Sequence, residues 1–108
     1  MKVVISAEAR SDLQSIGDWI ARDSTRRASR FVREILGRCQ SLGARPASYQ
    51  VVMTVRDRSV RRCVHGAYLV FFEIEPFSAI VRILRILHGA REYAELLGAA
   101  DRIEGDDD

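Results

Sequence analysis

The amino-acid sequence predicts an α+β domain: a two-helix hairpin packed on one face of a three- to four-stranded antiparallel sheet, followed by a short C-terminal helix. Apolar residues recur at helical spacing in two consecutive segments between residues 6 and 42, and short runs rich in β-branched and aromatic residues follow from residue 50. The 108 residues, 47% of them hydrophobic, fit a single small domain. We expect this domain to span residues 1–98, with 99–108 an acidic, disordered tail.

The first two elements are predicted from residues 2–22. The segment KVVI, residues 2–5, is typical of a short strand. Ser6 is a suitable N-cap, and Glu8 lies in the following turn, where the helix dipole favours an acid. A first helix ending near Arg22 is indicated by four apolar residues spaced four, three and four apart: Ala9, Leu13, Ile16 and Ile20.

A second helix is predicted to begin almost at once, because Asp23-Ser24-Thr25 breaks the first helix and offers capping side chains. Gly43 and Pro46 mark its end. Since only two or three residues separate the helices, we expect an antiparallel hairpin. The apolar face of the second helix consists of Ala28, Phe31, Val32, Ile35, Cys39 and Leu42.

The strands are predicted from the runs QVVMTVR, VRRCV, AYLVFFEI and AIVRILRIL, separated by breaks at residues 57–59, 65–66 and 76–78. Such short connections indicate an antiparallel meander. Regular alternation along the last run would place Ile80, Arg82, Leu84 and Ile86 on one face and Val81, Ile83, Arg85 and Leu87 on the other. After it, AREYAELLG, residues 90–98, predicts the short C-terminal helix.

Charge and cysteine content restrict the function classes. The last eight residues hold five acids and one base, which leaves 16 basic and 10 acidic residues in 1–100, a net charge of +6. A basic body suits an acidic partner, but charge alone does not choose between protein and nucleic acid. Cys39 and Cys63 have neither disulfide nor zinc spacing, so we expect two buried small hydrophobes. Without a signal peptide or an apolar run long enough to span a bilayer, the expected location is cytoplasmic.

Four segments together resemble toxins of the ParE/RelE superfamily. They occur in the order EARSDLQSIGDWIARD, ASRFVREILGRCQSLGARP, VRRCVHGAYLVFFEIEP and RILRILHGAREYAELL, and they cover roughly residues 2–98. The last segment, with a strand followed by His-Gly-x-Arg and a short helix, is similar to the ParE-type ending. The resemblance implies the toxin of a type II toxin–antitoxin system, without cofactor or metal.

The resemblance also implies partners and sites. A ParE-like toxin inhibits DNA gyrase and is not an enzyme; it is neutralised by a cognate antitoxin, expected to be of the ribbon-helix-helix class, whose C-terminal segment wraps the toxin. Neither direct sequence-specific nucleic-acid binding nor membrane association is expected. The residues expected to bind the gyrase target are Arg85, His88, Arg91 and Tyr93. Those expected to bind the antitoxin are Leu13, Ile16, Trp19, Ile20, Phe31, Ile35, Leu36, Arg61 and Arg62.

The alternative that the resemblance implies is a RelE-like, ribosome-dependent mRNA endonuclease. Its candidate catalytic residues are Arg61, Glu73, Arg85, His88 and Tyr93, with His88 as the general acid because imidazole titrates near neutral pH. Against it, nuclease members place their His or Tyr in the final residues, whereas here a helix and an acidic tail follow His88. A third hypothesis is a partner that has lost toxicity and serves only in operator repression.

Several of these residues also have structural explanations. Glu73 and Glu75 are placed to pair across strands with Arg82 or Arg85. Tyr68 alternates with apolar residues and is expected to pack at the core or its rim, and His88 suits a cap at the sheet edge. The basic run Arg56, Arg58, Arg61 and Arg62 fits a solvated strand edge.

Overall fold

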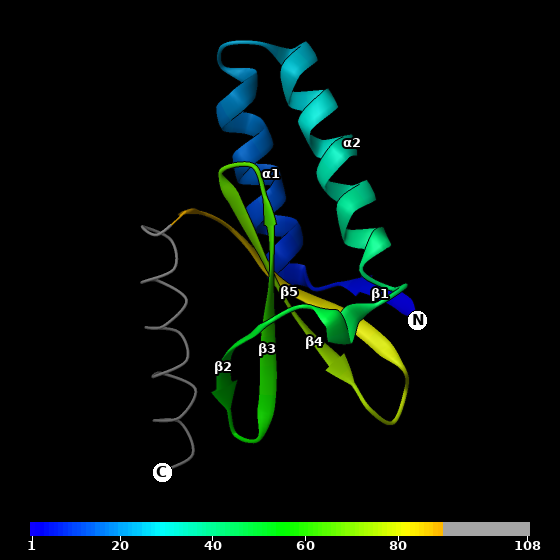
Figure 1. Cartoon of the computed structure of the whole chain (residues 1–108). Coiled ribbons are helices and arrows are strands. Elements are labelled where there is room, and N and C mark those ends of the chain that lie inside the picture. Colours follow the sequence, from blue (N-terminus) through cyan, green and yellow to red (C-terminus); the bar gives the residue numbers. More distant parts are fainter. Residues whose placement is uncertain (90–108) are drawn as a thin grey trace.

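The computed structural model describes residues 1–89 as two helices packed on a five-stranded sheet (Figure 1). The sheet order is β1-β5-β4-β3-β2. In chain order the elements are β1 (Lys2–Ile5), α1 (Ala7–Ala21), α2 (Thr25–Ser41), a short 3-10 helix η1 (Pro46–Ser48), β2 (Val51–Val55), β3 (Arg58–His65), β4 (Tyr68–Glu75) and β5 (Ile80–His88). The predicted α+β class and helical hairpin are confirmed. The predicted C-terminal helix and acidic tail lie outside the described residues.

The sheet differs from the expected one in its fifth strand. β2 to β5 form the predicted antiparallel meander, but β1 joins it as a parallel edge strand, with Lys2 opposite Ile80 and Ile5 opposite Ile83. The sheet is therefore mixed rather than purely antiparallel. A four-residue apolar strand carries no signal of which distant strand it pairs with, so the sequence indicated the strand but not its partner.

Both helices begin at serine N-caps: Ser6, as predicted, and Ser24, one of the three capping residues predicted for the second helix. The Ser6 hydroxyl accepts a hydrogen bond from the backbone N–H of Ala9 at 3.0 Å, and that of Ser24 accepts one from Arg27 at 3.2 Å. Ser6 also donates to the carbonyl oxygen of Leu84 in β5 at 3.0 Å. This residue therefore fixes the start of α1 and ties it to the sheet.

The main core lies between the helices and the sheet. Its buried side chains include Ile35, Cys39 and Leu42 from the helical layer and Phe72 and Ile83 from the sheet. On the opposite face a second apolar cluster is formed by Val60, Phe71 and Leu87, all buried, with Val52, Met53, Leu69 and Leu84 packed against them. Both cysteines are free and buried, as predicted, and burial raises the pKa of the Cys39 thiol to about 11.

A β-bulge in β5 makes the predicted alternation of this strand wrong. Phe71 pairs with Arg85 and Phe72 with Ile83, so Leu84 is an extra residue in the ladder. The insertion reverses the side-chain order beyond it. Val81, Ile83 and Ile86 consequently share the core beneath the helices, and Leu87 joins the cluster on the other face.

The turns of the meander use backbone conformations with positive φ. Arg56 and Asp57 have φ values of 50° and 65°, which is the pattern of a type I′ hairpin turn between β2 and β3. The turn lies at residues 56–57, whereas the break was predicted at residues 57–59. Arg58 and Ser59 already belong to β3. Gly66, with φ 60°, lies in the next turn at the predicted position.

Gly43 follows the C-cap of α2, as predicted, but for a different reason. Its φ is not positive, so no left-handed conformation demands a glycine. Instead, a Cβ built at Gly43 would overlap the backbone carbonyl oxygen of Met1, and the Met1 amino group donates to the Gly43 carbonyl at 2.8 Å. The glycine permits this close approach of the two backbones.

We predict that Gly43→Ala destabilises the protein by about 1–3 kcal/mol, because backbone must shift to admit the methyl group. The measurement is urea unfolding followed by circular dichroism. The matched control is Gly37→Ala, where a Cβ would meet nothing within 4 Å. A helical Gly→Ala change without a clash should raise stability by roughly 0.5–1 kcal/mol. Equal effects of the two substitutions would contradict this role of Gly43.

Candidate partner-binding groove

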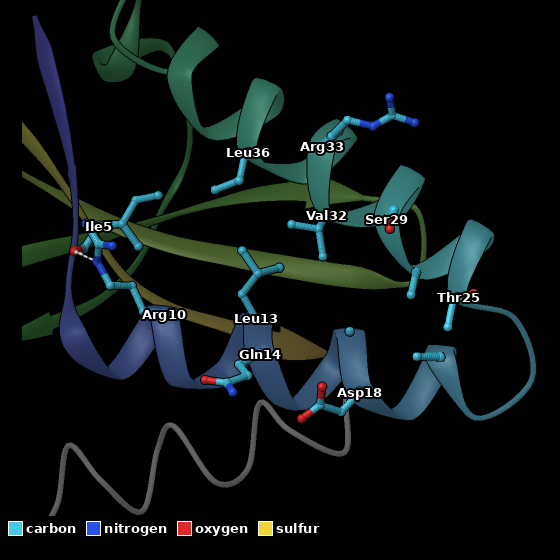
Figure 2. A pocket seen from close by; sticks show the side chains of 13 residues that line it. Ile5, Arg10, Leu13, Gln14, Asp18, Thr25, Ser29, Val32, Arg33 and Leu36 are labelled. Carbon is cyan, nitrogen blue, oxygen red and sulfur yellow. Dashed lines mark hydrogen bonds between the residues drawn. The ribbon is translucent and has the colours of Figure 1, made fainter.

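A groove of about 850 Å³ runs between α1 and α2 (Figure 2). It is lined by Ile5, Arg10, Leu13, Gln14, Gly17, Asp18, Ala21, Thr25, Ala28, Ser29, Val32, Arg33 and Leu36. The two helices approach closely here, since a Cβ at Gly17 would lie 3.4 Å from Cγ2 of Val32. Residues of both helices thus form its walls, and a groove between two helices is a site in which a helical segment of another protein can bind.

The floor of the groove is apolar and its rim is charged. Leu13 and Ala28 are buried at the bottom, and Val32 and Leu36 are half-buried and point from α2 towards α1. Exposed polar side chains border it, including Arg10, which donates from Nε to the Ile5 carbonyl, and Asp18 on the α1 side. An amphipathic segment can bury its apolar face on this floor and place charges at the rim.

The predicted antitoxin-binding residues are spread over several environments. Leu13 and Leu36 line the groove, whereas Ile35 is fully buried in the core and offers no surface. Ile16 and Phe31 are half-buried against the core, Ile20 is half-buried, and Trp19 is 63% exposed. On β3, Arg61 is held by the carbonyl oxygens of Ala47 (3.2 Å) and Tyr49 (2.6 Å), and Arg62 is half-buried.

Sequence reasoning missed much of the groove lining. Gly17 and Ala28 are small residues on the facing sides of the two helices, and they create the depression that larger side chains would fill. Val32 was recognised as part of the apolar face but not as groove lining. The available signal was the occurrence of small residues on the inner faces of a predicted helical hairpin.

Arg85, predicted to bind the target, forms an ion pair with Asp12 of α1. Its Nε and Nη2 donate to the two carboxylate oxygens of Asp12 at 2.7 and 2.9 Å, and Asp12 also accepts the backbone N–H of Ile86 at 3.0 Å. Both side chains are largely buried, with 22% and 14% exposure. The pair fastens α1 to the part of β5 that extends beyond β1.

The acidic residues of β4 have arginine partners, but not quite the expected ones. Glu75 pairs with Arg82, as one of the alternatives predicted, with 2.6 Å between Nε and Oε1. This contact, together with the Ser78 hydroxyl, lowers the pKa of the Glu75 carboxyl. Glu73 is buried and pairs with Arg58 through both carboxylate oxygens, with 2.7 Å from Nε to Oε2. Glu73 lies opposite Arg82 in the strand ladder, yet its partner is Arg58. The hydrogen bonds to Glu73 raise the pKa of the Arg58 guanidinium.

Of the candidate nuclease residues within 1–89, Glu73 and His88 lie far apart. In β4, Glu73 lies five residues from Tyr68, the residue that pairs with His88, so Glu73 and His88 are separated by roughly 16 Å along the sheet. A general base and acid acting at one phosphate must both lie within hydrogen-bond reach of it. Arg61 and Arg85 are occupied by the contacts described above. Tyr93, and Arg91 of the predicted gyrase site, lie outside the described residues.

His88 lies exposed at the end of β5 in a small aromatic cluster. Its ring is 5.2 Å from that of Tyr68, which in turn lies 4.8 Å from Phe31 of α2. His65 stands 6.2 Å from Phe31 on the other side. Tyr68 therefore packs at the rim of the core, as predicted, and its half-burial raises the pKa of its hydroxyl.

Two classes of site are not found among residues 1–89. Within this part of the chain, no three His, Cys, Asp or Glu side chains gather as ligands for a metal ion. Neither α1 nor α2, the two helices of the described chain, is long and apolar enough to span a bilayer.

The fold is that of the RelE/ParE-like toxins. A helical hairpin packs on one face of the antiparallel meander, and the N-terminal strand β1 pairs with β5 at the edge of the sheet. A solved structure described as "Chromosomal ParDE TA system from P. aeruginosa" is similar to it, with a TM-score of 0.67 and 18% sequence identity. The match covers 82% of this chain and 96% of that one. No curated protein matches the sequence.

The sequence itself identifies the family within that fold. Residues 3–93 match the family described as "ParE toxin of type II toxin-antitoxin system, parDE". The chain therefore belongs to the ParE toxin family, as the four sequence segments predicted.

Proposed function

We propose that this chain inhibits DNA gyrase and is neutralised by a cognate antitoxin whose amphipathic segment occupies the groove between α1 and α2. The observation that supports the antitoxin part is the groove itself, with buried Leu13 and Ala28 at its floor and half-buried Val32 and Leu36 on its α2 wall. A partner segment that fills this groove buries its apolar floor, and binding to the folded chain alone stabilises the fold. The ribbon-helix-helix class of the antitoxin follows from the resemblance alone.

The proposed gyrase contact lies at the C-terminal end of β5, away from the α1–α2 groove. His88 is exposed there, beside Tyr68, and Arg91 and Tyr93 follow it in the sequence. Arg85 no longer belongs to this surface, because its guanidinium is committed to Asp12. We infer that it positions the end of β5 rather than contacting gyrase.

We propose that the toxin acts by binding rather than by catalysis. Two features support this: the separation of Glu73 from His88 and the neutralisation of Glu73 by Arg58. Both carboxylate oxygens of Glu73 already accept hydrogen bonds from the Arg58 guanidinium, which does not suit a group that must act on a substrate hydroxyl. Gyrase and the chromosome on which it acts lie in the bacterial cytoplasm. We therefore propose the cytoplasm as the location of this chain.

The test is a gyrase supercoiling assay run beside an in vitro translation assay. Purified chain is expected to block ATP-dependent supercoiling of relaxed plasmid and to leave ribosome-bound mRNA intact. His88→Ala should weaken gyrase inhibition about tenfold or more, since truncating one central contact residue costs on the order of 1–2 kcal/mol. Intact supercoiling together with cleaved mRNA would replace this proposal by the nuclease alternative.

A further inference from the structure

The outer face of α2 carries three arginines that the fold does not use. Arg26, Arg30 and Arg33 are all exposed, and within the described chain they make no hydrogen bond or ion pair. Four arginines of the sheet behave differently: each is bound by a carboxylate or by backbone carbonyls, namely Arg58, Arg61, Arg82 and Arg85. We call the surface formed by Arg26, Arg30, Arg33 and the neighbouring Gly37 the arginine ridge.

Helix geometry aligns these residues. At about 100° per residue, the three arginines and Gly37 fall within an arc of roughly 60° on one side of α2. From Arg26 to Arg33 the ridge extends about 10 Å along the helix axis. Each exposed guanidinium can contact one phosphate, so the ridge can make about three phosphate contacts.

The position of one ridge arginine, Arg26, is unfavourable for the helix itself. Arg26 and Arg27 lie in the first turn of α2, which contains no acid, and the N-terminal end of a helix dipole repels cations. A sequence adapted only to stability would place acids there. The charges therefore indicate an anionic partner outside the chain.

Gly37 gives a second, independent indication. A glycine in the middle of a helix lowers its stability, and here no packing explains it, because a Cβ would meet nothing within 4 Å. Gly37 lies on the same side of α2 as the three arginines and has no side chain there. The backbone of another molecule can therefore approach α2 closely at this point.

We propose that the arginine ridge binds the phosphate backbone of duplex DNA without sequence preference. A protein segment would be drawn to the neighbouring groove instead, since the ridge itself carries only arginine side chains and a glycine. Arg33 stands where the ridge meets the rim of that groove. Figure 2 shows this division: Val32 and Leu36 point towards α1, whereas Arg33 points away from it. Guanidinium groups match phosphate oxygens in pairs, and phosphate contacts position proteins on DNA. The inference goes beyond the proposed function, because neither the gyrase contact nor the antitoxin groove requires this chain to bind DNA.

The experiment measures fluorescence anisotropy of a labelled 20-base-pair duplex of arbitrary sequence, titrated with the full chain at several KCl concentrations. Three phosphate contacts predict that the slope of log K against log salt contains a contribution of about −2.7. The variant R26Q/R30Q/R33Q should lose at least tenfold in affinity at about 50 mM KCl, and its slope should become shallower by that amount. Gly37→Glu should also weaken binding, and a melting temperature no lower than that of the unaltered chain would show that the fold is intact.

The matched control removes three exposed or rim charges elsewhere, in K2Q/R10Q/R45Q. It lowers net charge equally and should weaken binding less than threefold. The proposal is overturned if the two triple variants weaken binding equally, or if the unaltered chain does not bind the duplex at low salt. It is also overturned if poly-glutamate binds the ridge with the same affinity and salt slope as DNA, because the partner would then be an acidic protein.

Discussion

Replacement of Asp12 by alanine is expected to lower the free energy of unfolding by about 2–3 kcal/mol. The substitution leaves the guanidinium of Arg85 without its carboxylate and removes the acceptor for the N–H of Ile86. Breaking a fully buried pair costs about 3–5 kcal/mol, and the partial exposure of this one reduces the expected effect. The measurement is urea unfolding at neutral pH, analysed with a two-state fit.

Asp18→Ala is the matched control, since Asp18 is an exposed acid on the same helix. Its effect should stay within about 0.5 kcal/mol. In a double-mutant cycle, Asp12→Ala and Arg85→Met should show a coupling energy of about 1–2 kcal/mol. If Asp12→Ala costs no more than the control, then the ion pair does not fasten α1 to β5.

Replacement of Ser29 by tryptophan is expected to weaken antitoxin binding about a hundredfold. Ser29 is exposed on the wall of the groove, so an indole at this position fills the space proposed for the antitoxin segment without entering the core. Loss of a central, well-packed contact region lowers the binding free energy by about 3 kcal/mol, which corresponds to about a hundredfold in affinity. The affinity is measured by isothermal titration calorimetry with the purified antitoxin.

Gln40→Trp provides the control for this substitution. Gln40 is exposed on α2 but does not line the groove, and the same indole there should change the affinity less than threefold. Circular dichroism should show equal helicity for both variants. Equal affinities of Ser29→Trp and the unaltered chain would exclude the groove as the antitoxin site.

The parts of the fold that depend on neighbouring residues were predictable from the sequence. Ser6 and Ser24 have the chemistry of N-caps, and the spacing of apolar residues defined both helices before any partner was known. The parallel pairing of β1 and the bulge at Leu84 were not predictable, because each depends on contacts between distant segments. No local pattern in the sequence reports such contacts.

The candidate site was also only partly predictable from the sequence, because it too depends on contacts between distant residues. The ion pair of Asp12 with Arg85 joins residues 73 positions apart, and several other acids were equally plausible partners for this arginine. The apolar residues expected at the antitoxin surface were chosen from one face of each helix. Packing then placed Ile35 in the core and left Val32 and Gly17 at the groove. Which residue of an apolar stripe stays accessible depends on how closely the two helices approach.

We propose that the antitoxin neutralises the toxin through the α1–α2 groove, while gyrase is bound elsewhere. A supercoiling assay tests both parts at once: the antitoxin is titrated into a mixture of gyrase and either the unaltered chain or Ser29→Trp. We expect both proteins to inhibit gyrase equally. The antitoxin should restore supercoiling with the unaltered chain but need about a hundredfold more to do so with the variant. Restoration at the same antitoxin concentration, or loss of inhibition by Ser29→Trp itself, would contradict the claim.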